Sequence, residues 1–127
     1  MKDYEVTITD SSKDLTTREK IKLNDLSICK QLDQLTAEDD VVIIDVDYYV
    51  EFAVHNEKAR DKDYKKIVIV DKDGTRYITG SDTFRRSLVD IADDLAEAGE
   101  LDDFKIRVYR KPSKNYAGKD FLTCSLD

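Results

Sequence analysis

The sequence predicts a single α+β domain in which antiparallel strands predominate. Two observations lead to this class. Apolar and polar side chains alternate in several short runs, which is typical of half-buried strands, and only one long stretch has the period of an amphipathic helix. The length of 127 residues fits one domain, residues 1–127, with a core that needs no disulfide or metal. We divide it into an N-terminal extension, residues 1–40, and a barrel, residues 41–127.

The N-terminal extension is expected to contain a strand followed by helical pieces. Residues 3–9 alternate between apolar and polar side chains, so they are predicted to form a strand. Thr16 and Glu19 have the spacing of a capping box, which starts a helix. Residues 10–40 are therefore predicted to hold one helix or two short helical pieces. Their apolar residues are expected to line one helical stripe: Leu26, Ile28, Leu32 and Leu35.

Three strands are predicted next. The first covers residues 41–54 and carries β-branched and aromatic side chains at alternate positions, all expected on one face: Ile44, Val46, Tyr48, Val50, Phe52 and Val54. A polar loop at His55–Asp63 leads to an aliphatic strand at Lys65–Val70. The pair Asp73-Gly74 is a turn signal, so a hairpin is expected to join this strand to the third, at Thr75–Thr79.

One helix and two further strands complete the barrel. The helix is expected to start at Ser81, whose hydroxyl can cap the first turn, and to stop at Gly99; its apolar stripe consists of Phe84, Leu88, Ile91 and Leu95. Residues 104–109 alternate again, a loop follows at 112–118, and residues 120–126 are rich in β-formers. This order, with one helix between strands 3 and 4, is that of an OB-like five-stranded barrel. A curled antiparallel sheet covered by one helix would give the same pattern.

The composition excludes several classes of protein. The formal net charge of −7 opposes polyanionic partners if the charge is evenly spread. The longest aliphatic runs, Val41–Ile44 and Ile67–Val70, are far shorter than the roughly 20 residues that span a bilayer, so no membrane contact is expected. The first residues contain no apolar signal segment, which predicts a cytoplasmic protein. Cys29 and Cys124 are expected to be buried, reduced thiols.

The charge is in fact unevenly spread. Residues 82–103 hold eight acids and two arginines, whereas residues 104–119 hold six bases and no acid. A second, mixed basic cluster lies at residues 58–66. OB folds bind oligonucleotides on strands 2 and 3 and with the loops that join strands 1 to 2 and 4 to 5, which here are residues 56–64 and 111–119. Because both loops are basic, we expect single-stranded DNA, or RNA, as the partner.

Cations and aromatic rings are the residues expected to bind it, since cations follow the phosphates and rings stack bases without reading their identity. The expected nucleic-acid-binding residues are Lys58, Arg60, Lys62, Tyr64, Lys66, Tyr77, Lys105, Arg107, Tyr109, Lys111, Lys114, Asn115, Tyr116 and Lys119. One face of the strand is predicted to carry Lys105, Arg107, Tyr109 and Lys111. Tyr49, on the polar side of the first strand, is a weaker candidate. For each tyrosine the alternative is a packing residue with a solvated hydroxyl.

The C-terminal half also resembles a known family. The segments concerned are Val68-Ile69-Val70-Asp71, Gly74-Thr75, Tyr77-Ile78-Thr79-Gly80-Ser81 and Phe84, followed by PSKNYAGKDFLTCSL at residues 112–126. Together they are similar to the small single-stranded-DNA-binding-like proteins that bacteriophages and prophages of Gram-positive bacteria encode. The resemblance implies an OB-type barrel, a cytosolic location and a role in phage DNA replication or recombination.

No catalytic residue, metal site or cofactor is predicted, so the chain is not expected to be an enzyme. His55 is the single histidine and is expected to be structural. Cys124 has no evident histidine partner, and Asp45 and Asp47 lack a third metal ligand nearby in the sequence.

The alternative function is that of a protein-interaction module. The acidic face of the helix at residues 82–98 would dock on a basic partner protein, as a DNA mimic or as an inhibitor of a host enzyme. The residues of that face are Asp90, Asp93, Asp94 and Glu97.

Overall fold

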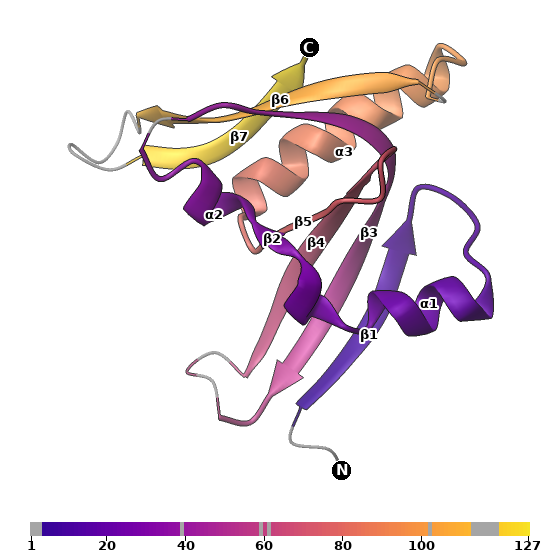
Figure 1. Cartoon of the computed structure of the whole chain (residues 1–127), viewed down its shortest axis with the longest axis vertical. Helices are drawn as coiled ribbons and strands as arrows, with labels where there is room; N and C mark the ends of the chain where they lie inside the picture. Colours follow the sequence, from indigo (N-terminus) through magenta and orange to yellow (C-terminus); the bar gives the residue numbers. More distant parts are fainter. Residues whose placement is uncertain (1–3, 39, 59, 61, 102, 113–119) are drawn as a thin grey trace.

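The strands of the computed structural model form one curled, mostly antiparallel sheet, a half-barrel with helices on both sides (Figure 1). The structure describes residues 4–38, 40–58, 60, 62–101, 103–112 and 120–127. Within these residues the elements are β1 (Tyr4–Ser11), α1 (Thr17–Leu23), β2 (Lys30–Gln31), α2 (Leu32–Leu35), β3 (Val42–Asn56), β4 (Asp63–Asp71), β5 (Arg76–Thr79), α3 (Asp82–Glu97), β6 (Phe104–Pro112) and β7 (Asp120–Leu126). The strand order is β2-β5-β4-β3-β6-β7, and β1 pairs with β3. The predicted α+β class with mainly antiparallel strands is confirmed.

The sheet is built on β3, which pairs with three other strands. One edge of β3 pairs with β4 over Val46–His55. The other edge pairs with β6 over Val42–Val46 and then with β1 over Val50–Asn56. Ser12 fills the space between these two partners, because its N–H donates to the Tyr49 carbonyl (3.0 Å) and its hydroxyl accepts the Tyr49 N–H (2.9 Å). β3 therefore connects the half of the sheet that holds β6 to the half that holds β1.

A β-bulge at Asp47 reverses the two faces of β3. The register with β4 advances two residues on β3, from Val46 to Tyr48, for one residue on β4, and the extra residue Asp47 is exposed. Because side chains alternate with a period of two, residues of the same parity point to opposite sides before and after the bulge. The single apolar face predicted for residues 41–54 is therefore wrong. Ile44 and Val46 face α3, whereas the following residues face the N-terminal segment: Tyr48, Val50, Phe52 and Val54.

Two apolar clusters result, one on each side of the sheet. Cluster 1 lies between the sheet and α3, and cluster 2 lies between the sheet and the N-terminal segment that includes α1. β4 contributes to both, with Ile67 and Ile69 in cluster 1 and Val68 and Val70 in cluster 2. A strand that is buried on both faces reads as an uninterrupted aliphatic run, and this explains the sequence of β4.

α3 begins and ends as predicted. The hydroxyl of Ser81 accepts the N–H of Phe84 (3.2 Å), which caps the first turn. Gly99 follows the last turn with φ +74°, a left-handed conformation that favours glycine. The predicted apolar stripe is confirmed, with buried or half-buried side chains that pack in cluster 1: Phe84, Leu88, Ile91 and Leu95.

The N-terminal segment forms short helical pieces after the predicted β1 strand. The capping box of Thr16 and Glu19 starts α1, with both reciprocal hydrogen bonds present (3.2 and 3.1 Å). The chain then makes a 3₁₀ turn at Leu26–Ile28 before β2 and α2. The common helical stripe predicted for this region is wrong, because separate turns do not share a face: Leu32 is fully buried while Ile28 is 60% exposed.

A closed five-stranded barrel is not confirmed, because β5 and β7 do not pair within the described residues. The short helix α2 bridges the two sides of the gap. At the end of β5 the Thr79 hydroxyl donates to Asp33 Oδ2 (3.0 Å). From β6 the Arg110 guanidinium donates to the Asp33 carbonyl (2.8 Å) and to the Thr36 hydroxyl (3.1 Å). The side chain of Leu32, in α2, is buried in cluster 1 and closes the core at this gap.

Deletion of Asp47 is expected to abolish cooperative folding, because it would turn every later side chain of β3 to the opposite face. Asp47→Ala is the matched control: it keeps the residue count and is expected to change the free energy of unfolding by less than about 0.5 kcal/mol, as at other exposed positions. Urea denaturation followed by circular dichroism measures both. Equal stability of the two variants would contradict the role of the bulge.

Arg110→Ala is expected to lower the free energy of unfolding by about 1.5 to 3 kcal/mol, because the hydrogen bonds of a charged group to α2 are lost. Arg107→Ala, on the exposed face of the same strand, is expected to stay within about 0.5 kcal/mol of the parent. The same denaturation measurement distinguishes them. Similar values for the two variants would mean that Arg110 does not hold α2 in the gap.

Candidate nucleic-acid interface

β6 turns one row of side chains toward solvent. Its residues Ile106 and Val108 are fully buried in cluster 1. On the opposite face Lys105, Arg107 and Lys111 are exposed, and Tyr109 between them is half-buried. The alternation predicted for this strand is confirmed.

The strands beside β6 widen this surface. Arg107 lies opposite Ile43 of β3 and Ser125 of β7, so the three side chains stand on the same face. The aliphatic side chains of Ile43 and Val41 are 43% and 49% exposed. We call this face the β6 surface, and it comprises Val41, Ile43, Lys105, Arg107, Tyr109, Lys111 and Ser125. It combines cations, one ring and exposed aliphatic groups.

A hollow of about 360 Å³ opens in the β6 surface. It is lined by Val41, Arg107, Tyr109, Arg110 and Ser125. The ammonium of Lys111 stands 5.9 Å from the centre of the Tyr109 ring, within the range of a cation–π contact. A planar base stacked on this ring would have guanidinium and hydroxyl groups within its reach.

The second basic segment lies at the tip of the β3–β4 hairpin. Its exposed bases are Lys58, Arg60 and Lys62. Lys62 pairs with a neighbouring glutamate carboxylate (3.1 Å). Lys66 and Tyr64 follow on β4, where both are half-buried and the ammonium lies 5.7 Å from the ring centre. Because Tyr64 packs against cluster 2, its ring has a structural role.

The structure does not bring the two basic segments together. The tip of the β3–β4 hairpin and the end of β6 at Pro112 lie far apart along the long axis of the molecule (Figure 1). From Val46, where β6 ends its pairing, to His55, β3 spans about 30 Å of extended chain. The N-terminal segment covers the sheet face between them, and Lys13 of that segment stands 4.1 Å over the Tyr48 ring. We therefore treat the hairpin tip and the β6 surface as separate.

The other predicted residues are placed elsewhere. Tyr77 is half-buried on β5, opposite Lys30, and packs against cluster 1. The weaker candidate Tyr49 is wrong: its ring is buried in cluster 1, because the bulge points it toward α3, and this burial raises its pKa to about 12. The remaining predicted residues lie outside the described part of the chain: Lys114, Asn115, Tyr116 and Lys119.

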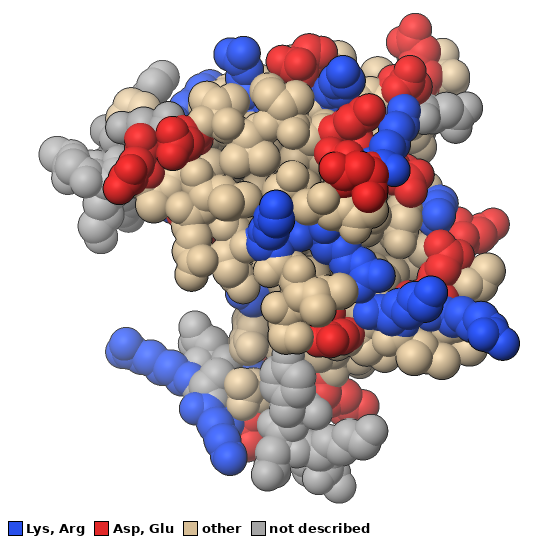
Figure 2. All heavy atoms as spheres, in the orientation of Figure 1, with Lys and Arg blue, Asp and Glu red and all other residues tan. Residues whose placement is uncertain are grey.

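Sequence reasoning missed a third basic surface, which α1, β2 and β5 form together. Figure 2 shows Lys and Arg side chains in a row across the part of the molecule that α1 and β2 occupy in Figure 1. Lys20, Lys22 and Lys30 are exposed, and the Arg76 guanidinium donates to the Lys22 carbonyl (3.1 Å). Lys20 and Lys22 are close in the sequence, but Arg76 is 54 positions from Lys22, so the sequence does not show that these bases share one surface.

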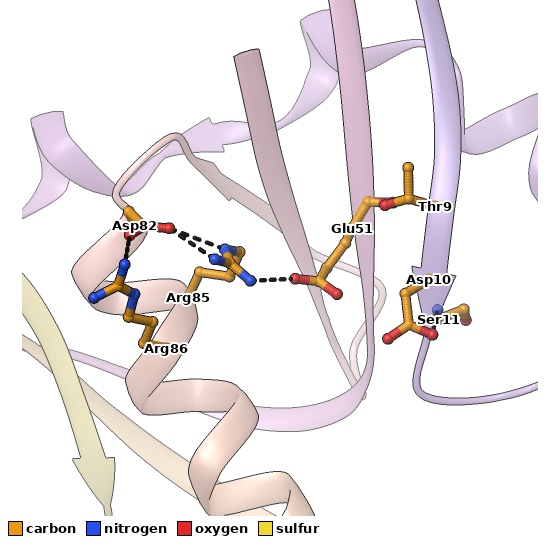
Figure 3. A network of polar contacts seen from close by, with 7 residues as sticks. All are labelled: Thr9, Asp10, Ser11, Glu51, Asp82, Arg85 and Arg86. Carbon is orange, nitrogen blue, oxygen red and sulfur yellow. Dashed lines mark hydrogen bonds and ion pairs between the residues drawn. The ribbon is translucent and has the colours of Figure 1, made fainter.

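The two arginines of α3 are paired with carboxylates (Figure 3). Arg85 donates to Asp82 (2.7 Å) and to Glu51 of β3 (3.2 Å), and Arg86 pairs with the same Asp82 (2.9 Å). This network ties the first turn of α3 to the middle of the sheet. The rest of the helix surface stays acidic, and its exposed acids form no ion pair with any described residue: Asp90, Asp93, Asp94 and Glu97.

The described part of the chain contains neither a cluster of metal ligands nor a disulfide. No three His, Cys, Asp or Glu side chains converge there to hold a metal ion. Cys29 and Cys124 are buried and unbridged, as predicted, and burial raises the pKa of the Cys124 thiol to about 12. None of the helices described has the length and apolar character that crossing a bilayer takes.

Comparison of the chain with protein-family models, with curated proteins and with solved structures found no match.

His55 links the two strands at the hairpin tip. Its Nδ1 lies 2.7 Å from Asp63 Oδ1, and its Nε2 lies 2.7 Å from Glu57 Oε1. The protonated imidazole donates from both nitrogens, so it satisfies both carboxylates. These hydrogen bonds, first the one to Asp63 and then the one to Glu57, raise the pKa of His55 above its usual 6.5.

An NMR titration of the His55 ring is expected to give a midpoint above 6.5, and Asp63→Asn is expected to lower it. Because the folded-state pKa is raised, the stabilisation by His55 is fully present below the unfolded-state pKa and is lost as pH rises through the folded-state value. His55→Gln should therefore destabilise the chain in acid and have little effect in alkaline buffer. A midpoint below 6.5 would contradict this arrangement.

Proposed function

We propose that the protein binds single-stranded nucleic acid through the β6 surface, as a binding protein rather than an enzyme. The observation that carries this proposal is a row of three exposed cations, Lys105, Arg107 and Lys111, with Tyr109 in the same row. No helix of the described residues covers this face of the sheet. Cations follow phosphates, and rings stack unpaired bases. The expected ligand is single-stranded DNA, with RNA as the alternative.

The exposed aliphatic groups favour a single strand over a duplex. Val41 and Ile43 lie beside the cations, and a duplex would keep the flat faces of its bases stacked and out of reach of these side chains. A single strand can turn its bases onto the sheet and its phosphates toward the cations. In an OB-like arrangement β6 is the fourth strand, so the β6 surface adjoins the loop that joins strands 4 and 5 and is separate from the usual binding face on strands 2 and 3. The resemblance of the C-terminal half to phage single-strand binders supports the same choice and would assign the protein to phage DNA replication or recombination.

The measurable consequence is a modest dependence of affinity on salt. Three phosphate contacts give a slope of log K against log salt of about −2.1 for a single strand, which is a loss of about 18-fold in affinity between about 50 and 200 mM salt. Fluorescence anisotropy of labelled oligo-dT, and of oligo-U in parallel, measures this slope. Absence of binding at low salt would refute the proposal.

Paired substitutions test which surface binds. Lys105→Ala with Lys111→Ala removes two of the three cations and is expected to reduce the slope to about −0.7. Lys20→Ala with Lys22→Ala makes the same change of net charge on α1 and is expected to leave the slope near −2. The reverse result would assign binding to the basic surface of α1, β2 and β5.

Tyr109→Ala is expected to weaken oligonucleotide binding by about 1 to 3 kcal/mol if the ring stacks a base, whereas Tyr109→Phe retains the ring and should bind like the parent. The same anisotropy measurement checks both variants. Equal loss in the two variants would show that the hydroxyl, not the stacking face, matters.

A second candidate function is favoured by the exposed acids of α3. Asp90, Asp93, Asp94 and Glu97 present four negative charges on one helix without ion pairs among the described residues. Such a face would suit a basic partner protein, as a DNA mimic or as an inhibitor of an enzyme. Two results together would support this candidate function. Oligonucleotides fail to bind, and a purified basic partner protein is bound by the parent but not by the charge-reversed Asp93→Lys, Asp94→Lys variant.

A further inference from the structure

Two guanidinium groups line the hollow in the β6 surface, and one of them forms no hydrogen bond to any described residue. Of its two arginines, Arg110 is occupied: its Nε donates to Thr36 and its two terminal nitrogens donate to the Asp33 carbonyl and to Asp120. Arg107 has only a 3.8 Å contact between its Nε and Asp127 among the described residues. The fork of Arg107 therefore remains available to a ligand, while Arg110 forms part of the wall.

The wall groups suit a flat, partly polar molecule. Tyr109 supplies a ring, and Val41 supplies an exposed aliphatic side chain, so the hollow has apolar groups for both packing and stacking. Ser125, across the strand pair from Arg107, supplies a hydroxyl that can donate or accept. Asp127 beside Arg107 partly offsets its positive charge, so a neutral base edge that matches the guanidinium can compete with a phosphate there. A thymine offers no such match, so in oligo-dT Arg107 contacts a phosphate.

The donors of Arg107 distinguish the four bases. A guanidinium offers two parallel N–H donors and no acceptor. Guanine presents two neighbouring acceptors, O6 and N7, which match this fork, whereas adenine presents an acceptor beside a donor. Cytosine also has neighbouring acceptors, O2 and N3, but a smaller ring to stack. Thymine has no such adjacent pair.

We propose that the hollow lined by Val41, Arg107, Tyr109, Arg110 and Ser125 is a base-binding site that prefers guanine, with Arg107 as the specificity-determining residue. The proposal rests on the proposed function, because a base reaches the hollow only when a single strand lies on the β6 surface. It adds a base preference to binding that is otherwise independent of sequence.

The test compares four short oligonucleotides that differ only at the central base: TTGTT, TTCTT, TTATT and TTTTT. The parent protein is expected to bind TTGTT about fivefold or more tighter than TTTTT, the lower end of the discrimination that a bidentate contact to guanine provides, with TTCTT second. Anisotropy competition at constant salt measures the ratios.

Arg107→Lys tests whether the preference depends on the two parallel N–H donors of the guanidinium or only on its positive charge. This variant keeps one positive charge at an exposed position, so it is expected to fold. The readout is the ratio of its affinities for TTGTT and TTTTT, because a change in the general contacts of residue 107 with the strand alters both affinities alike. Its preference for TTGTT is expected to disappear. Lys105→Arg, which leaves Arg107 in place, is the matched control and should retain the preference.

Two results would overturn the proposal while leaving the proposed function intact: equal binding of all four oligonucleotides by the parent, or a guanine preference that survives Arg107→Lys. Failure of all four oligonucleotides to bind would overturn the proposed function and the base site with it.

Discussion

One extra residue in β3 determines how the rest of the chain is arranged. At Asp47 the bulge changes which side chains of β3 face α3, so the apolar residues that follow it form a second cluster on the other side of the sheet. Polar contacts hold the backbone here: the Asp71 carboxylate accepts the N–H of Asp45 (3.0 Å), and the N–H of Lys72 donates to the Asp45 carbonyl (2.9 Å). Without this change of face, the N-terminal segment would lose the β3 part of the apolar surface that it covers, and only the contributions of β4 and β5 would remain.

The half-barrel leaves the β6 surface open to solvent. The N-terminal segment covers the sheet around Tyr48, while α2 and Arg110 close the gap between β5 and β7. Neither element covers the outer side of β6. The exposed aliphatic residues Val41 and Ile43 therefore stand beside three cations and a ring. A single strand matches this surface because it carries phosphates and flat apolar bases in the same molecule.

The net charge of −7 weakens binding to the β6 surface less than its size indicates. The positions of the charged residues matter more than their total. α3 packs on the opposite side of the sheet, and a layer of secondary structure is about 10 Å thick. The Debye length is about 8 Å at physiological salt, so the acids of α3 are largely screened from a ligand on β6. Their repulsion is expected to matter at low salt and to keep a strand away from the helix side. The charge that bears on binding is the local one of Lys105, Arg107 and Lys111.

The elements that could be predicted from the sequence are those whose signals are local. The capping box at Thr16, the start of α3 at Ser81 and the alternation of β6 follow from contacts between residues a few positions apart. The exposed row of the candidate site was predictable for the same reason. Which faces of the sheet are covered depends on tertiary contacts, because one bulge reverses the parity of β3 and buries Tyr49. The tertiary structure also decides which charges are neighbours: the curl of the sheet separates the hairpin tip from β6, and Arg76 meets Lys22 from a distant part of the chain. Such relations depend on how strands pair and bend, and a pattern read along one strand does not contain them.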